Sequence, residues 1–108
     1  MNIKNKIIYI SGKIKNNNQA EQEFEEAEQQ IKKKGYNAIN PLKITKTIRF
    51  MDQEQFMELD FALIKMADEV YVLENWRKSK GAVAEIKFAK AIGKKVKFQS
   101  KQWSLKWK

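Results

Sequence analysis

Short runs of apolar residues alternate along this chain with longer stretches in which apolar residues recur every three or four positions. The short runs end at polar residues, and they predict four buried β-strands, at 6–10, 36–39, 69–73 and 95–98. The longer stretches predict three amphipathic helices, at 19–34, 52–67 and 81–92. Strands that alternate with helices of this length are typical of βαβ units and therefore of a parallel sheet.

Capping residues mark where the predicted helices begin and end. The first helix carries acids early and lysines late, which suits the helix dipole, and Gly35 follows it as a C-cap. Asp52 can cap the second helix, and Gly93 closes the third. Residues 42–50 are basic and irregular. The inner face of the second helix is predicted from the spacing of its apolar residues, which are Phe56, Leu59, Leu63, Met66 and Ala67.

The predicted fold class is α/β, a three-layer flavodoxin- or Rossmann-like fold with helices on both faces of a parallel sheet of four to five strands. Right-handed crossovers and a central first strand give the strand order 2-1-3-4. Residues 1–108 are expected to form a single domain, with 99–108 as a basic, Trp-containing C-terminal tail. Ligands of such sheets bind at the carboxyl ends of the strands, where loops 11–13 and 74–81 border the crevice between strands 1 and 3.

The composition excludes several kinds of chemistry. The chain has no Cys and no His, which removes disulfides, thiolate metal sites, and the commonest general base and metal ligand. Acid–base or nucleophilic steps therefore fall to Asp, Glu, Tyr, Lys, Ser or Thr, and we expect neither a metal nor a cofactor. No apolar run approaches the length of a membrane span, and the N-terminal residues lack a signal-peptide pattern. We therefore expect a cytoplasmic protein without membrane contact.

Positive charge gathers toward the C-terminus. The formal net charge is +9, and no acid follows Glu85. This imbalance favours anionic partners such as nucleotides, nucleic acid or acidic proteins, although a solubilising lysine surface is an alternative. In the tail, Trp103 and Trp107 are interleaved with lysines. This pattern could bind nucleic acid weakly, insert at a membrane surface or cover a neighbouring subunit. We favour the last, because exposed Trp usually finds an apolar partner surface.

Two acids occupy positions where core residues are expected. Asp60 follows Phe56 by four residues and so falls on or beside the apolar face of the second helix. Glu85 follows Ala82 by three residues on the third helix. A buried carboxylate needs a paired donor or a polar cavity. Both acids belong to elements that flank the predicted crevice, which favours a ligand site there. Alternatively, each of the two acids lies at the edge of the apolar face of its helix, where it reaches solvent or pairs with a lysine.

Small residues precede Glu85. Gly81 leaves the backbone open to close approach, and free N–H groups at a helix N-terminus suit a phosphate. Ser79 could donate to the same anion or serve as an ordinary helix cap. No glycine-rich nucleotide-binding motif is present. Tyr9 is either a core tyrosine or a third polar group of the site, and Trp76 could stack on a base or pack over the sheet end.

Four short motifs together resemble a known family. They are Tyr9-Ile10-Ser11-Gly12, Gly35-Tyr36 with Asn40-Pro41, Asp60 with Asp68 eight residues later, and Trp76-x-x-Ser79-x-Gly81-Ala82-x-x-Glu85. In order and spacing these motifs are similar to the small phage and bacterial DUF4406 proteins over residues 6–98. That family in turn resembles the nucleoside 2-deoxyribosyltransferase superfamily, which includes the 2'-deoxynucleoside 5'-phosphate N-hydrolases.

The resemblance implies a role for each matching residue. The catalytic glutamate of the superfamily, a nucleophile toward the anomeric carbon of the sugar, matches Glu85. The aspartate that protonates or binds the base matches Asp60, and the tyrosine near the sugar matches Tyr9. Six residues before the glutamate, the monophosphate hydrolases carry a serine for the 5'-phosphate, where true transferases carry an aspartate. Ser79 therefore favours the hydrolase-like branch, with Gly81 beside it.

The segment after the first strand departs from the pattern of the hydrolases. Their Gly-Ser-Ile-Arg becomes Gly12-Lys13-Ile14-Lys15 here, which keeps a cation and loses the serine. The residues expected to contact substrate are Ser11, Gly12, Lys13, Trp76, Ser79 and Gly81.

The resulting hypothesis is a nucleotide-binding enzyme that cleaves or transfers the N-glycosidic bond of (deoxy)nucleoside 5'-monophosphates and assembles as a homo-oligomer. Carboxyl groups that flank this bond suit its oxocarbenium-like transition state. One alternative is a non-catalytic protein that binds or sequesters a nucleotide or nucleotide signal in the same crevice. A less favoured alternative is a nucleic-acid-binding module that acts through the tail.

Overall fold

The structure is a computed structural model that describes residues 5–99 of the chain. Its elements, in chain order, are β1 (Ile7–Ser11), α1 (Ala20–Lys33), β2 (Asn37–Ile39), α2 (Pro41–Thr45), α3 (Gln53–Met66), β3 (Glu69–Val72), the 3-10 turn η2 (Trp76–Lys78), α4 (Lys80–Ala91) and β4 (Lys95–Phe98). Apart from Gln99, the predicted tail at 99–108 lies outside the described residues. No helix of residues 5–99 combines the length and the apolar character needed to cross a bilayer.

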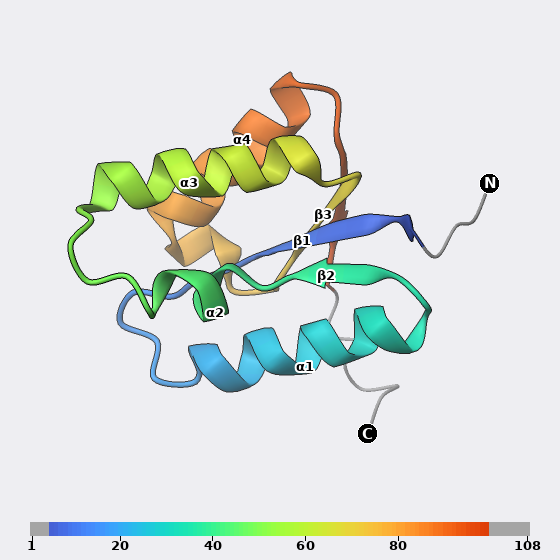
Figure 1. The fold of residues 1–108 in the computed structure, drawn as a ribbon, viewed down its shortest axis with the longest axis horizontal. Coiled ribbons are helices and arrows are strands. Elements are labelled where there is room, and N and C mark those ends of the chain that lie inside the picture. Colours follow the sequence, from blue (N-terminus) through green and yellow to red (C-terminus); the bar gives the residue numbers. More distant parts are fainter. Residues whose placement is uncertain (1–4, 100–108) are drawn as a thin grey trace.

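The four strands of the described chain form one parallel sheet in the order β2-β1-β3-β4. α1 lies against one face of this sheet, and α3 and α4 pack together against the other (Figure 1). The predicted α/β class, the strand order and the placement of helices on both faces are thereby confirmed. The carboxyl ends of β1 and β3, where the strand order switches direction, lie next to each other.

The sheet separates two apolar cores, because successive residues of a strand point to opposite faces. The core on the α1 side consists of Ile8, Ile10, Ala20, Phe24, Ala27, Ile31 and Leu73. The core on the side of α3 and α4 consists of Tyr9, Ile64, Ala67, Val70, Val72, Ile86 and Ala89. Even-numbered residues of β1 therefore face α1, and odd-numbered residues face α3 and α4.

The helix ends follow the predicted capping residues. The Asp52 side chain accepts a hydrogen bond from Gln55 N at 2.8 Å, and Asp52 N donates to the Gln55 side chain at 3.0 Å, which completes a capping box. Gly35 and Gly93 follow α1 and α4 with φ angles of 87° and 80°. This left-handed conformation favours glycine, so the predicted role of both glycines as helix terminators is confirmed.

Two short helical turns differ from the sequence prediction. α2 falls in the segment predicted to be irregular, although its start carries two recognised signals. Asn40 Oδ1 accepts a hydrogen bond from Leu42 N at 3.1 Å, and Pro41 occupies the first helical position. η2 falls in the predicted loop after the third strand. Both turns are too short for a hydrophobic period to reveal them.

The predicted inner face of α3 is right for Ala67, which is buried, and wrong for Met66, which is 61% exposed. Ile64, which the prediction left out, is fully buried. Apolar residues occupy most positions in the second half of α3, so two adjacent faces are similarly apolar. Because the hydrophobic period then favours neither face, the packing against β1 and α4 decides which one is buried.

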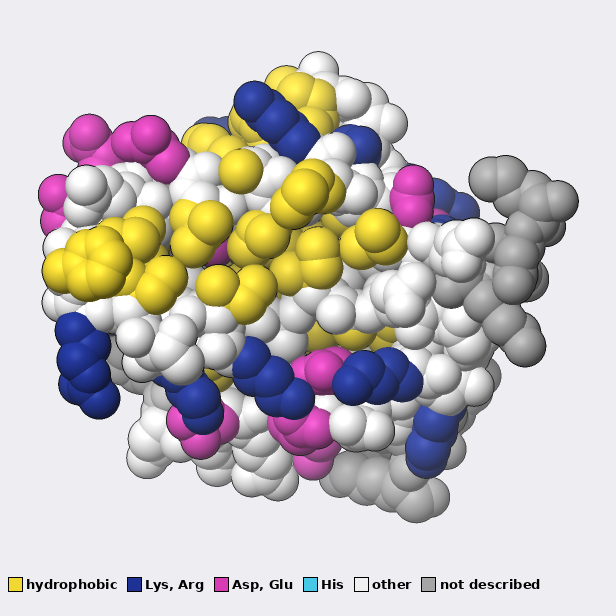
Figure 2. Space-filling model, in the orientation of Figure 1, with side chains coloured by type: hydrophobic (Ala, Val, Ile, Leu, Met, Phe, Trp, Pro, Cys, Tyr) yellow, Lys and Arg dark blue, Asp and Glu magenta, His cyan; other side chains and the backbone are white. Residues whose placement is uncertain are grey.

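The outward side of α3 carries a band of apolar surface that we call the α3 band (Figure 2). The most exposed large apolar side chains in α3 and in the segment before it are Met66, at 61%, and Phe50, at 87%. Acidic side chains gather beside the N-terminal end of α3 at one edge of the band, and basic and acidic side chains alternate along the other edge. The α3 band is therefore an apolar surface bordered by charged side chains.

Candidate active site

Two hydroxyl groups from β1 converge on one carboxylate from α4. The Tyr9 hydroxyl donates a hydrogen bond to Glu85 Oε2 at 3.0 Å, and the Ser11 hydroxyl donates one to Glu85 Oε1 at 2.6 Å. Both hydroxyls point to the same face because side chains two residues apart in a strand lie on one side of the sheet. Glu85 is 6% exposed, so it is a buried carboxylate with paired donors and not a solvated acid at the edge of a stripe.

Asp60 joins this cluster from α3. Its side chain is 8% exposed and interacts with both Glu85 and Tyr9. Burial raises the pKa of Asp60, and hydrogen bonding with Glu85 and Tyr9 opposes part of that rise. Asp60 Oδ1 is buried and has no hydrogen-bond partner within residues 5–99. Such an atom can accept a hydrogen bond from a ligand or donate one to it when the carboxyl is protonated.

Burial raises the pKa of both Glu85 and Asp60. Burial and the neighbouring Asp60 charge raise the pKa of Glu85 to about 8, although the Ser11 and Tyr9 hydroxyls oppose the rise. The pair therefore retains one proton at neutral pH and titrates as a unit. At neutral pH the raised pKa of Glu85 keeps the proton on Glu85, although the two hydroxyl donors favour its charged form. The cluster thus combines an ionised carboxylate with a carboxylic acid, the pairing that nucleophilic attack with proton donation needs.

Tyr9 is a neutral hydrogen-bond donor in this cluster. Burial, together with the negative charge of Glu85 and Asp60, holds the pKa of the Tyr9 hydroxyl well above its usual value. Tyr9 therefore keeps its proton at physiological pH and orients Glu85 without exchanging a proton with it.

The N-terminus of α4 lies one to two turns before Glu85. The Ser79 hydroxyl accepts a hydrogen bond from Ala82 N at 3.0 Å, so Ser79 is the N-cap of this helix. Gly81 lies in the first turn, where an added Cβ would come within 3.4 Å of Met57 Cε. Met57 from α3 therefore packs over the start of α4. The positive end of the helix dipole lies roughly 6–9 Å along the axis from Glu85.

Gly12 and Lys13 hold the loop after β1 in place. A Cβ on Gly12 would come within 2.8 Å of the Leu73 side chain, so the backbone can approach the end of β3 only at a glycine. Lys13 N donates a hydrogen bond to Asn75 Oδ1 at 3.2 Å, and the Lys13 ammonium group donates one to the Lys15 carbonyl. These contacts of Lys13 are with the loops and not with the carboxyl pair.

Trp76 lines a cavity beside β4. Its ring packs against Phe98 of β4 with 5.4 Å between the ring centroids, and the Arg77 guanidinium lies 4.9 Å from the Trp76 ring centroid. These three side chains line a cavity of about 600 Å³ at the carboxyl ends of β3 and β4, and no residue of the carboxyl cluster lines it. Trp76 also contacts predicted site residues, because Ser79 N donates a hydrogen bond to Trp76 O at 3.0 Å and the Trp76 side chain packs against the core cluster that contains Tyr9.

Sequence reasoning missed two features of this site. It assigned Ser11 to substrate contact, whereas the Ser11 hydroxyl bonds Glu85. The signal for this contact was the spacing of two between Tyr9 and Ser11, which puts both hydroxyls on one face of the strand. It also missed Met57, which lies one helical turn before Asp60. No group of three or more acidic side chains that could hold a metal ion occurs within residues 5–99.

Known proteins resemble this chain in sequence and in fold. The family described as a domain of unknown function (DUF4406) matches residues 6–98. Among solved structures, the CMP N-glycosidase BcmB of Clostridium botulinum matches with a TM-score of 0.63 and 25% sequence identity, over 86% of this chain and 67% of that chain. No curated protein matches the chain significantly.

Proposed function

The chain belongs to the DUF4406 family, and we propose that it cleaves or transfers the N-glycosidic bond of a nucleoside 5'-monophosphate, with Glu85 as the nucleophile. The observation that carries this proposal is the buried carboxyl pair, in which Glu85 receives two hydroxyl donors and Asp60 lies beside it. The similarity to a CMP N-glycosidase supports the same class of reaction at a coarse level.

In the first step of this proposal, the proton of the carboxyl pair moves from Glu85 to Asp60, and a Glu85 oxygen then attacks C1' of the sugar while the bond between C1' and the base nitrogen breaks. The electron pair of that bond leaves with the base, and Asp60 donates its proton to the departing base. Positive charge develops on the sugar in the transition state, and the buried carboxylate stabilises it. The product of this step is a glycosyl ester of Glu85.

In the second step, a water molecule attacks C1' and the ester bond to Glu85 breaks. Asp60, now ionised, accepts a proton from the water, which restores the starting pair and releases the sugar phosphate. A second base in place of water gives transfer instead of hydrolysis. Tyr9 and Ser11 hold both Glu85 oxygens in position throughout and stabilise the carboxylate when it leaves.

The 5'-phosphate in this proposal binds at the N-terminus of α4. Backbone N–H groups and the helix dipole favour an anion there, and the anion would approach beside Met57, which packs over Gly81. The exposed Lys78 and Lys80 add positive charge on either side of Ser79. The separation of roughly 6–9 Å between this helix end and Glu85 is comparable to the span of a sugar ring with its 5'-phosphate.

The test of this function is the release of free base from a panel of ribo- and deoxyribonucleoside 5'-monophosphates that includes CMP, followed by chromatography. We expect release from at least one member and a loss of roughly a thousandfold or more in the Glu85→Gln variant. The matched control is Glu58→Gln, which removes an exposed carboxylate from α3. No release from any member, or equal release by Glu85→Gln, would contradict the proposal.

A second candidate function is nucleotide binding without catalysis, and the low exposure of the carboxyl pair favours it. With Glu85 at 6% and Asp60 at 8% exposure, a sugar reaches them only if the side chains that cover them move. Calorimetric titration with the same nucleotides separates the two functions. Tight binding without base release, unchanged in Glu85→Gln, is the result expected of a binding protein.

We further propose that two copies of the chain associate through the α3 band. Large exposed apolar patches mark interaction surfaces. A two-fold axis through the band would bury the apolar side chains of both copies against each other. The mass measured by light scattering is expected to fall to that of a monomer in Met66→Lys but not in Gln22→Lys, which adds the same charge on exposed α1 surface. A wild-type mass of one chain at every concentration would rule this association out.

A further inference from the structure

One half of the sheet has no helix on the α1 side. α1 packs on β1 and β2, whereas α3 and α4 lie on the opposite face (Figure 1). Among the helices of residues 5–99, none lies over β4 on the α1 side. Parallel sheets occur almost only with both faces covered, because their strands are apolar on both sides. This part of the sheet therefore lacks an expected cover.

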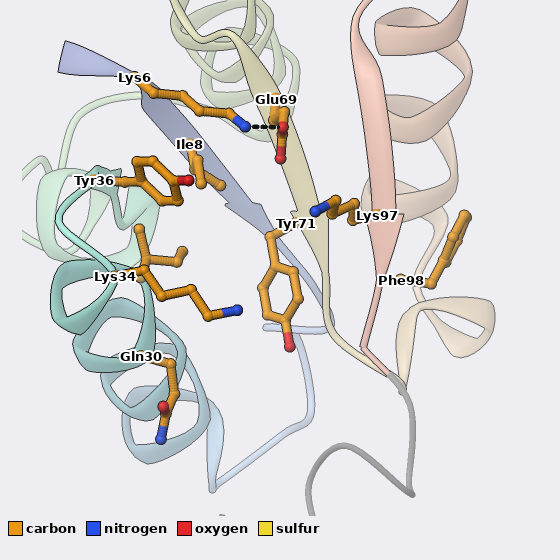
Figure 3. A pocket seen from close by; sticks show the side chains of 10 residues that line it. Lys6, Ile8, Gln30, Lys34, Tyr36, Glu69, Tyr71, Lys97 and Phe98 are labelled. Atoms are coloured by element: carbon orange, nitrogen blue, oxygen red, sulfur yellow. Dashed lines mark ion pairs between the residues drawn. The ribbon is translucent and has the colours of Figure 1, made fainter. Parts of the chain in front are cut away.

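A groove of about 340 Å³, which we call the β3–β4 groove, occupies this uncovered area (Figure 3). The Tyr71 ring extends from β3 toward α1, and Ile8 and Tyr36 lie on the wall opposite. Lys34, at the C-cap of α1, and Lys97 from β4 point in from opposite sides. The groove is thus lined by aromatic and aliphatic side chains, by the Lys6–Glu69 ion pair and by these two lysines.

We propose that residues 100–108 of the same chain cover the β3–β4 groove. Gln99 N donates a hydrogen bond to Val72 O at 2.7 Å, and the Gln99 side chain accepts one from Glu74 N at 3.1 Å, which fixes the chain at the end of β4. Lys97 lines the groove, and residue 100 follows it by only three positions, so residues 100–108 start at the rim of the groove. Nine extended residues span roughly 30 Å, and a four-residue strand spans only about 13 Å. The segment is therefore long enough to turn back across the groove.

The segment also matches the groove in chemistry. Trp103, Leu105 and Trp107 alternate with polar residues, so in an extended conformation all three side chains would lie on one face of the segment. Tryptophan is the best cation–π acceptor among side chains, and two lysines point into the groove. Gln30 Oε1 is buried there without a hydrogen-bond partner in residues 5–99. An indole N–H is a donor only and seeks such an acceptor.

Introduced cysteines test this contact in the full chain, which has no cysteine of its own. Gln30→Cys with Leu105→Cys is expected to form a disulfide within one chain under mild oxidation, seen as a faster-migrating monomer on a non-reducing gel. The matched control is Gln29→Cys with Leu105→Cys, because Gln29 neighbours Gln30 but is exposed and bonded to Glu25. We expect the control pair to oxidise at least about tenfold more slowly, since a disulfide needs Cα atoms within about 7 Å.

Each other outcome of this experiment overturns the proposal. Equal oxidation rates for the two pairs, or no disulfide in either, would show that the segment does not lie in the groove. A covalent dimer as the main product would show that the segment covers a second copy.

Thermal unfolding gives an independent measurement that needs no cysteine. Replacement of both Trp103 and Trp107 by Ser is expected to lower the Tm by about 4 °C or more, because apolar contact with the groove is lost. The control, Gln102→Ser in the same segment, is expected to leave the Tm unchanged. Equal Tm values for all three proteins would contradict the docking of this segment.

Discussion

Glu85 holds its proton to much higher pH in the folded protein than in the unfolded chain, because burial and the Asp60 charge raise its pKa from 4.5 to about 8. Below pH 4.5 the group is protonated in both states and contributes nothing to the pH dependence of stability. Between pH 4.5 and 8 the unfolded state releases the proton first, so the free energy of unfolding falls as the pH rises. Above pH 8 the full cost of the buried charge is present.

Glu85→Gln is therefore expected to raise the free energy of unfolding at pH 9 and to change it little at pH 4. Urea unfolding at pH 4, 7 and 9 measures this difference, with Glu58→Gln as the exposed control whose effect should not vary in the same way. A Glu85→Gln variant that is less stable than wild type at pH 9 would show that Glu85 is part of the structural framework.

Ser11→Ala removes the 2.6 Å hydrogen bond to Glu85 and should raise the pKa of Glu85 further. Less of the nucleophile is then ionised at neutral pH. We expect base release at pH 7 to fall by roughly tenfold and to recover toward the wild-type rate at higher pH. The measurement is the pH profile of kcat/KM, whose acid limb should move to higher pH. A uniform loss at every pH would instead indicate distorted packing.

At the scale of elements, a second buried carboxylate joins α1 to α2. Glu28 is 6% exposed; it accepts a hydrogen bond from Asn40 Nδ2 at 3.1 Å and forms ion pairs with Lys32 at 3.0 Å and Lys43 at 2.9 Å. Burial acts to raise the pKa of Glu28, but these three partners outweigh it and hold the pKa at about 2. Unlike Glu85, Glu28 is stabilising when it is charged.

Because the folded pKa of Glu28 lies below the unfolded value of 4.5, its contribution is present above pH 4.5 and is lost as the pH falls toward 2. Glu28→Gln is expected to lower the free energy of unfolding at pH 7 by about 1–3 kcal/mol and to have little effect at pH 2. Denaturant unfolding at both pH values checks this, with Glu26→Gln on the exposed side of α1 as the control. An equal loss of unfolding free energy at both pH values would show that Glu28 stabilises the protein through packing and not through its charge.

At the scale of the whole molecule, the net charge of +9 is large for 108 residues. Repulsion among these charges destabilises the compact state, and salt screens it. The Tm is therefore expected to rise by roughly a few degrees between 0.02 and 0.3 M NaCl. Differential scanning calorimetry measures this rise, and KCl should reproduce it because the effect depends on ionic strength. A lower Tm at the higher salt concentration would show that the attractive ion pairs dominate.

The order of elements was predictable because strand and helix periods differ and because connections between parallel strands are right-handed. Asp60 and Glu85 could be located as candidates for the same reason, since an acid at a core position of a helix is conspicuous. The phase of α3 could not be predicted, because two of its faces are similarly apolar. The packing of Trp76 against Phe98 of β4 could not be predicted either, because it joins distant parts of the chain and spacing does not encode it.

β1 serves both the core and the site, and its alternation sets limits on protein engineering. Ile8 and Ile10 belong to the core under α1, whereas Tyr9 and Ser11 touch Glu85. A combinatorial library that varies positions 9 and 11 therefore changes the hydrogen-bond donors to Glu85 and leaves the core under α1 intact. An insertion or deletion of one residue within the strand would exchange the two sets and destroy both together. Substitution, and not a change of strand length, is the route by which this scaffold can acquire a different nucleophile environment.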